Sequence, residues 1–121
     1  MKSLQSCIAA AGPVDALGID NQGESCLAWN GETKEAISPV IVWQDNRTQA
    51  RLDALRADGV ADFVQEKTGL PLDPYFSASK LAWLYDQVPE AQRLQSEGKL
   101  RLGTTDAFFL DRLTGRFVSD I

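Results

Sequence analysis

The sequence predicts part of an α/β or α+β domain, and three observations lead to this prediction. Short apolar segments joined by polar turns come first, within residues 14–43. Segments with helical periodicity and helix-ending glycines follow, within residues 45–115. The last residues, 116–121, begin an extended segment that the chain end cuts off. We therefore expect a piece of a domain rather than a complete one.

Three strands are expected near the start of the chain. The segments "VDALGID" (14–20), "ESCLAWN" (24–30) and "SPVIVW" (38–43) are short and apolar, and the polar turns "NQG" and "NGETKE" separate them. This arrangement predicts an antiparallel meander. Before it, "MKSLQSCIAAAG" is expected to be a truncated helix that packs on the next strand. The alternative, a signal peptide, is disfavoured because the apolar part is short.

Helices are expected in five segments: residues 45–59, 60–69, 77–88, 89–98 and 104–115. Asp45 is the expected N-cap of the first helix, and Gly59 ends it. The third has the clearest periodicity, behind a Ser77 cap, with one apolar face formed by Leu81, Leu84, Tyr85 and Val88. Two prolines in "LPLDPY" (70–75) predict a fixed loop, and "LRLG" (100–103) is a short strand or a linker.

Composition limits the partners and the compartment. The chain has 121 residues, enough for one modest domain, and a formal net charge of −5. This charge argues against nucleic acid or an anionic membrane as the main partner, and no apolar run is long enough for a membrane span. Cys7 and Cys26 lack CxxC spacing, which favours two free thiols in a cytoplasmic protein over the alternative of one bridge.

The chain contains no histidine. This excludes His-based zinc sites and the Ser–His and Cys–His nucleophile pairs within these residues. The nucleotide motifs GxxxxGK[ST] and GxGxxG are also absent. The segment "IDNQGES" has a slight likeness to an acidic phosphate loop, but ordinary hairpin turns produce the same pattern. Acid–base chemistry would fall to carboxylates, Lys, Tyr or a group outside this chain.

Three residues are candidates for a ligand site. Glu24 follows a glycine at the start of a strand, Trp43 ends a strand, and Tyr75 lies in a proline-flanked loop. Each alone has an ordinary structural role: a solvated carboxylate, a core tryptophan and a packing tyrosine. Together they offer a carboxylate acceptor, an apolar ring face and a phenol hydroxyl, the set that a small polyhydroxylated ligand needs.

Four ordered blocks carry a family resemblance that covers nearly the whole chain from Val14: "GIDNQGESCLAWN", "PVIVWQDNRT", "TGLPLDPYFSASKLAWL" and "GTTDAFFLDRLTG". They resemble the amino-terminal domain of FGGY carbohydrate kinases, with glycerol kinases the nearest branch. The resemblance implies an α/β fold: a partial ribonuclease H-like domain of the actin/hexokinase type, with short antiparallel strands followed by several helices. It also implies transfer of the γ-phosphoryl group of Mg-ATP to a hydroxyl of glycerol or a related polyol or sugar.

The resemblance assigns roles to four positions. Glu24 matches the family's substrate-binding glutamate, Trp43 the tryptophan against the substrate carbon chain, and Tyr75 the tyrosine that bonds a substrate hydroxyl. The arginine that precedes the glutamate in the family falls on Gly23 here. This departure removes a guanidinium and its donors, so a polyol or sugar other than glycerol is the expected substrate.

The resemblance also implies what lies outside the chain. Residues 1–121 would form part of the N-terminal substrate-binding domain, with the phosphate-loop strands before residue 1 and the catalytic aspartate beyond Ile121. ATP and Mg²⁺ would belong to the parent enzyme, expected to be a homo-oligomer, and this fragment alone would be inactive. Its truncated sheet would favour self-association. The alternative function is a non-catalytic kinase-like protein that binds a ligand or a partner.

Overall fold

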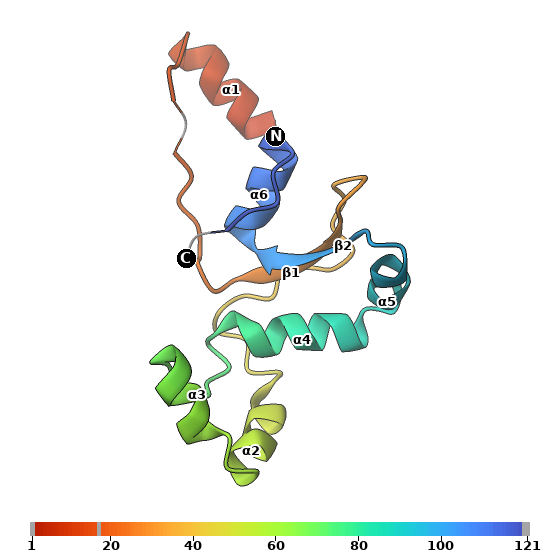
Figure 1. Ribbon diagram of the computed structural model, residues 1–121. Helices are drawn as coiled ribbons and strands as arrows, with labels where there is room; N and C mark the ends of the chain where they lie inside the picture. The colour runs from red at the N-terminus through yellow and green to blue at the C-terminus, as the bar shows by residue number, and fades with distance from the viewer. Residues whose placement is uncertain (1, 17, 120–121) are drawn as a thin grey trace.

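A two-stranded antiparallel sheet lies between helices in the computed structural model, which describes residues 2–16 and 18–119 (Figure 1). Each element contains the apolar spacing or the turn residues that its local structure requires. The elements, in chain order, are α1 (Lys2–Ala11), β1 (Cys26–Asn30), α2 (Gln49–Ala57), α3 (Ala61–Thr68), α4 (Ser77–Gln87), α5 (Pro89–Ser96), β2 (Leu100–Thr104) and α6 (Thr105–Thr114).

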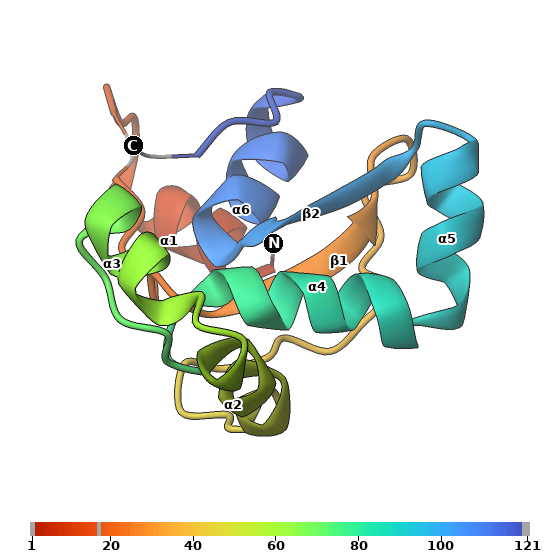
Figure 2. The same ribbon diagram turned by 60° about the horizontal axis from the view of Figure 1, so that its bottom comes forward.

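The sheet is buried on both faces. In the antiparallel ladder Cys26 pairs with Thr104 and Asn30 pairs with Leu100. Because side chains alternate along a strand, β1 presents one set to each face. Helix α4 crosses one face and α6 covers the other (Figure 2). This double coverage explains why "CLAWN" is almost uniformly apolar.

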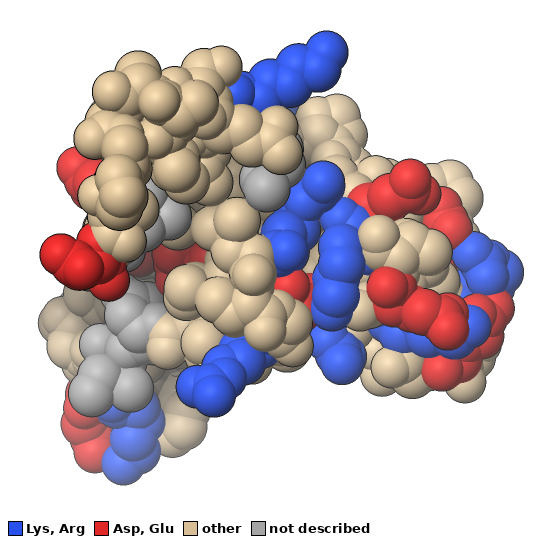
Figure 3. Space-filling model, turned by 90° about the horizontal axis from the view of Figure 1, so that it is seen from above, with Lys and Arg blue, Asp and Glu red and all other residues tan. Residues whose placement is uncertain are grey.

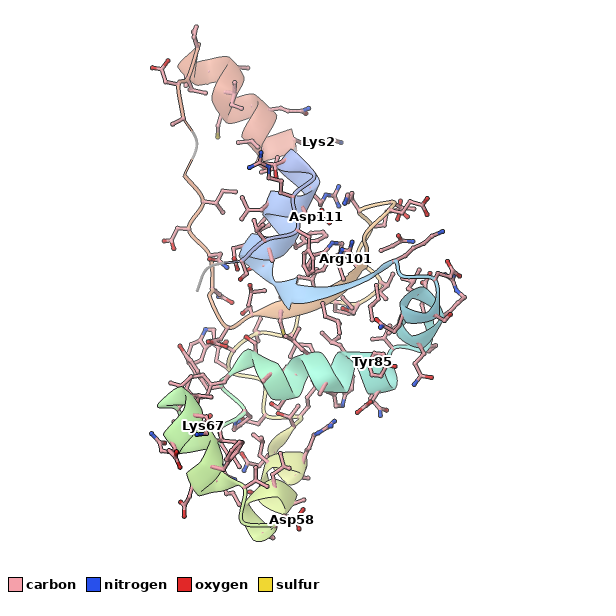
Figure 4. The ribbon with its side chains drawn as sticks, viewed as in Figure 1. Lys2, Asp58, Lys67, Tyr85, Arg101 and Asp111 are labelled. Atoms are coloured by element: carbon pink, nitrogen blue, oxygen red, sulfur yellow. The ribbon has the colours of Figure 1, made fainter. Side chains whose placement is uncertain are left out.

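Two apolar clusters form the core. The larger lies between the sheet, α4 and α5 and contains Cys26, Ala28, Ile41, Leu84, Ala91, Leu94 and Leu100. The smaller lies under α6 and contains Leu27, Trp29 and Ala107. The Trp29 indole N–H donates to the buried Asp111 of α6 at 2.8 Å, and Lys34 Nζ donates to the same carboxylate at 2.7 Å (Figure 4). This network fixes α6 and the turn at 31–35 against the sheet.

The predicted meander is wrong. Strand β1 pairs with β2, far along the chain, and residues 14–16 and 18–20 form no strand, while residue 17 lies outside the described part. No β-bridge reaches the described residues of 14–20, and a strand needs such a partner for its backbone groups. Residues 38–43 contribute only the bridge between Ile41 and Cys26, since Pro39 has no N–H to donate.

The helices appear where they were expected, with two cap assignments corrected. Helix α2 begins at Gln49, and Asp45 instead accepts from the Arg47 N–H in a turn before it. Ser77 is the first residue of α4 rather than its N-cap, which is Phe76. Helix α1 is present, but none of its residues is buried, so it does not pack on a following strand.

The two cysteines are not joined to each other. Cys7 is exposed, Cys26 is buried and both are free, so the alternative of a bridge is wrong.

Charged side chains of both signs gather over α5 and the turn at 31–35, at the right of Figure 3, where Arg93 pairs with Glu97 and Lys99 with Glu32. None of the helices in the described ranges combines the length and the apolar character of a membrane span.

Candidate functional site

The site lies at the end of the sheet where β1 begins. Cys26 and Ile41 form an antiparallel bridge through two backbone hydrogen bonds of 3.0 and 2.8 Å. Continuing this pairing by two residues places Glu24 opposite Trp43. Next to this pair, a direct hydrogen bond joins the two segments: the Trp43 backbone N–H donates to Ser25 Oγ at 3.2 Å. The register of β1 thus explains why two residues so far apart in the sequence meet.

Glu24 connects this end of the sheet to α4. Its Oε2 accepts from the Ser77 backbone N–H at 2.7 Å and from the Ser77 hydroxyl. A carboxylate at a helix N-terminus satisfies a free backbone donor and interacts favourably with the helix dipole. Glu24 therefore does what a capping residue of α4 would do, and it does so from another element.

Trp43 and Tyr75 are in ring contact. Their ring centroids lie 5.5 Å apart with a tilt of 58°, and the Tyr75 ring also contacts Phe76 edge-on at 5.3 Å. Trp43 is 38% exposed and Tyr75 is 44% exposed, so both rings keep a face open to a ligand. A tryptophan at the end of a strand is often part of a core. Here it is partly exposed and lies beside a second aromatic ring.

The polar atoms of the three residues leave capacity for a ligand. Within the described ranges no hydrogen bond reaches Glu24 Oε1, the Tyr75 hydroxyl or the Trp43 indole N–H. Glu24 Oε1 can accept a hydrogen bond, the Trp43 indole N–H can donate one, and the Tyr75 hydroxyl can do both. Such a set fits the hydroxyl groups of a polyol, while the rings fit its C–H face.

Gly23 lies beside this group on the surface. It is exposed, and a Cβ built on it would meet no atom within 4 Å among the described residues. Its backbone φ is outside the left-handed range. The position therefore has room for a longer side chain, and the space next to Glu24 is open in this protein. The glycine is not required by the local backbone.

Three charged side chains, Asp45, Arg47 and Lys80, lie close behind the site. Asp45 accepts two hydrogen bonds from the Arg47 guanidinium, at 2.9 and 2.7 Å, and these bonds hold the pKa of Asp45 below its usual range. The same guanidinium lies 4.5 Å from the Trp83 ring centroid. Lys80 is buried beneath the Tyr75 loop, and its burial lowers the pKa of its ammonium group.

The structure thus brings Glu24, Trp43 and Tyr75 together, with Gly23 beside them. Sequence reasoning missed Ser25, which holds the Trp43 backbone, and Lys80, which donates to the Tyr75 carbonyl at 2.7 Å. The signal for Lys80 was its place one turn before Leu84, on the apolar face of a predicted helix. No comparable signal marked Ser25.

A separate apolar cavity of about 140 Å³ lies on the other side of the loop, between α2, α3 and the start of α4. Its lining includes Leu52, Val64 and Phe76. Glu24, Trp43 and Tyr75 are not among its lining residues. The cavity is therefore distinct from the candidate site, although Phe76 contacts Tyr75 from its edge.

Comparison with known proteins gives a consistent result. The model of the N-terminal domain of the FGGY family of carbohydrate kinases matches residues 2–121. A glycerol kinase of Gluconobacter oxydans is 53% identical over 110 residues, which is 89% of this chain and 22% of that protein. A glycerol kinase of Herminiimonas arsenicoxydans is 47% identical over 111 residues, or 92% of this chain and 22% of that protein. The chain thus spans about a fifth of the length of these relatives.

A solved structure shows the same fold. The crystal structure of Plasmodium falciparum glycerol kinase with ADP superimposes with a TM-score of 0.74 at 31% sequence identity. The match covers 81% of this chain and 19% of that one. It confirms the expected class, a partial α/β domain of the ribonuclease H-like, actin/hexokinase type.

Proposed function

Because this chain belongs to the FGGY family of carbohydrate kinases, we propose that the whole protein transfers the γ-phosphoryl group of ATP to a hydroxyl of a polyol or sugar. In this proposal residues 1–121 form part of its N-terminal substrate-binding domain. The observation that supports it most is the convergence of Glu24, Trp43 and Tyr75 at one end of β1. The whole protein would be a cytoplasmic homo-oligomer.

Each of the three residues has a defined task in this proposal. Glu24 accepts a hydrogen bond from a substrate hydroxyl through Oε1, while its Oε2 stays bound to Ser77. The Trp43 ring packs against the C–H face of the carbon chain, and the Tyr75 hydroxyl bonds a second substrate hydroxyl. These contacts orient the substrate, and orientation is a large part of phosphoryl-transfer catalysis.

ATP and Mg²⁺ belong to other parts of the whole protein in this proposal. The described residues contain no group of three or more Cys, Asp or Glu side chains that could hold a metal ion. No step is assigned to the metal from residues of this chain, whose task is to bind and orient the acceptor. We expect no kinase activity from the 121 residues alone, because the proposal places the nucleotide, the metal and the catalytic aspartate elsewhere.

Gly23 directs the substrate proposal away from glycerol. The family resemblance places an arginine before the glutamate, at the position of Gly23. In this protein the space that its side chain would fill is open. A guanidinium would have bonded substrate hydroxyls, which the glycine leaves to other groups or to water. We therefore propose that the substrate is a polyol or sugar larger than glycerol, whose extra atoms occupy the space above Gly23.

The test is a substrate panel on the whole protein. ADP release is measured with glycerol, four- to six-carbon polyols and their aldoses. We expect turnover with a larger polyol and a kcat/KM for glycerol that rises in the Gly23→Arg variant. A strong preference for glycerol in the unmodified protein would contradict the proposal that its substrate is larger than glycerol. If the protein binds polyols but forms no ADP from ATP with any of them, the alternative of a non-catalytic ligand-binding protein is favoured.

A further inference from the structure

Lys80 is the only buried lysine or arginine among the residues that the structure describes. Its exposed fraction is 0%, although it stands on α4 near the surface loop that carries Tyr75. Lysine is rarely buried in full, because removing an ammonium group from water costs free energy unless a partner accepts its hydrogen bonds. A buried lysine therefore calls for a specific reason.

The hydrogen bond of Lys80 supplies that reason. Its Nζ donates to the Tyr75 backbone carbonyl at 2.7 Å, in partly buried surroundings. Helical side chains lean toward the N-terminus of their helix, so a lysine at the fourth position of α4 can reach the loop before it. The bond is not part of the helix. It ties the loop to the helix behind it.

The peptide groups of Tyr75 are held on both sides. Its N–H donates to Asp73 Oδ1 at 2.8 Å, and its carbonyl accepts from Lys80. Two residues later the Ser77 N–H is held by Glu24 at 2.7 Å. The backbone around Tyr75 is thus fixed at three points. Of these three bonds, only the bond from Lys80 has a charged donor.

We propose that Lys80 is a positioning residue: its ammonium group holds the Tyr75 carbonyl so that the tyrosine ring stays against Trp43 and its hydroxyl stays in the ligand site. The inference rests on the function proposed above. Burial lowers the pKa of the ammonium group, and this effect is partly offset by the nearby Cys26, Glu24, Asp45 and Asp73.

A purely structural role makes a different prediction. If Lys80 served only the stability of the core, its replacement would disturb the whole molecule and spare no particular contact. If it positions Tyr75, its replacement disturbs the pair of Trp43 and Tyr75 and spares Trp29. Trp29 lies in the other apolar cluster, under α6, and is bonded to Asp111.

The first test is spectroscopic and does not depend on kinase activity. The 121-residue chain contains three tryptophans, Trp29, Trp43 and Trp83, which give three ¹⁹F signals when labelled with 5-fluorotryptophan. The signal of Trp43 is assigned with Trp43→Phe, and its position without the tyrosine ring is defined by Tyr75→Leu. We expect Lys80→Met to move the Trp43 signal toward the Tyr75→Leu position and leave the Trp29 signal in place.

The control is Lys67→Met on α3, an exposed lysine paired with Glu66. It should move none of the three signals. An unchanged Trp43 signal in Lys80→Met overturns the inference. If Lys80→Met and the milder Lys80→Gln both move all three signals together, Lys80 serves the fold as a whole and the positioning role is wrong.

The second test is kinetic and uses the whole protein, with glycerol and the preferred polyol of the panel as probes. Lys80→Met should raise the KM for polyol by about tenfold, because a displaced contact group weakens substrate binding. The KM for ATP should stay within about twofold. Equal rises in both values, or an unchanged polyol KM, overturn the inference. If the unmodified protein phosphorylates no polyol, the proposed function fails and the ¹⁹F result alone decides whether Lys80 positions Tyr75.

Discussion

Cys26 is a thiol buried at the point where β1 meets residue Ile41. Burial raises the pKa of the Cys26 thiol from 9.0 to about 11. In the unfolded chain the thiol loses its proton near its ordinary value, whereas in the folded chain it keeps it. The folded state therefore binds more protons between these two values. The thiol stabilises the fold fully below pH 9 and loses this contribution as pH rises toward 11.

This predicts an alkaline loss of stability that depends on one residue. The thermal midpoint of the chain should fall between pH 9 and pH 11, and the fall should be shallower in Cys26→Ala. The measurement is a series of melts followed by circular dichroism. Cys7→Ala, at the exposed cysteine, is the matched control and should keep the full slope. Equal slopes in all three proteins would contradict the prediction.

Asp111 is a buried carboxylate that accepts hydrogen bonds from two side chains. Burial opposes its ionisation, but hydrogen bonds from Lys34 and Trp29 outweigh burial, so the pKa of the carboxyl lies below its usual range. Asp111→Ala would leave both donors without their acceptor. We expect a loss of about 2 kcal/mol in the free energy of unfolding, because the Trp29 N–H loses its acceptor in the core, whereas Lys34 is partly exposed and can turn to water.

Urea unfolding of Asp111→Ala measures this loss, with Asp15→Ala at an exposed aspartate as the control. The pH dependence has a definite sign. A carboxyl with a lowered pKa stabilises the fold above its ordinary value, and the contribution disappears as pH falls through the lowered value. The difference between the unmodified chain and Asp111→Asn should therefore shrink below pH 3.8. A difference that grows there would contradict this account.

Among the elements, α4 depends on a residue outside itself. No side chain of its own caps its N-terminus, and the Glu24 carboxylate binds the Ser77 N–H instead. Glu24→Ala should lower the free energy of unfolding by about 1 kcal/mol, the usual size of a lost helix cap. Chemical denaturation measures the change, and Glu66→Ala on the exposed face of α3 is the control. No difference between the two variants would exclude the capping role.

Local signals in the sequence predicted the helices well, but not two of the three expected strands. Gly59, Gly69, Gly98 and Gly115 all have positive φ and follow helices, as their sequence positions predicted. Cap residues were less reliable, because Asp45 and Ser77 found partners in a turn and on another element. The pairing of β1 with β2 could not be read at all, since periodicity within a segment does not say which distant segment lies beside it.

In the candidate site, too, the residues could be predicted from the sequence, but their spatial arrangement could not. Glu24, Trp43 and Tyr75 were identified from residue type and from the family resemblance, and their proximity in the structure was not predictable from spacing. The contact depends on the bridge between Cys26 and Ile41 and on the hydrogen bonds of Ser77 and Lys80. These are non-local interactions. Whether the three residues bind a substrate stays a prediction for the experiments above.

At the scale of the whole molecule, the sheet has one edge without a described partner. Strand β2 pairs with β1, and within residues 2–16 and 18–119 no strand pairs with its other edge. Several large apolar side chains are exposed, among them Ile8, Val14, Ile19, Phe109 and Phe117. Open edges and apolar patches favour association of one copy with another.

We therefore expect the isolated chain to associate as its concentration rises. Light scattering over a concentration series should show an increasing mean mass, and added salt should not reverse it, because apolar contacts are not screened. A clean monomer at high concentration would contradict the prediction. A charged substitution at an exposed apolar residue, Phe109→Lys, should reduce the association, whereas Phe63→Lys on α3, away from the sheet, should not.

The pairing of β1 with β2 has a consequence for the order in which the protein is made. Strand β1 leaves the ribosome before its partner, which lies beyond the four helices α2 to α5, at Leu100–Thr104. Until those residues emerge, the central strand of the core has only Ile41 and Ala36 to bridge to. Trp29 and Leu27 stay unburied from the time β1 is made until α6 has been made, so during that interval they depend on whatever shields apolar segments in the cell.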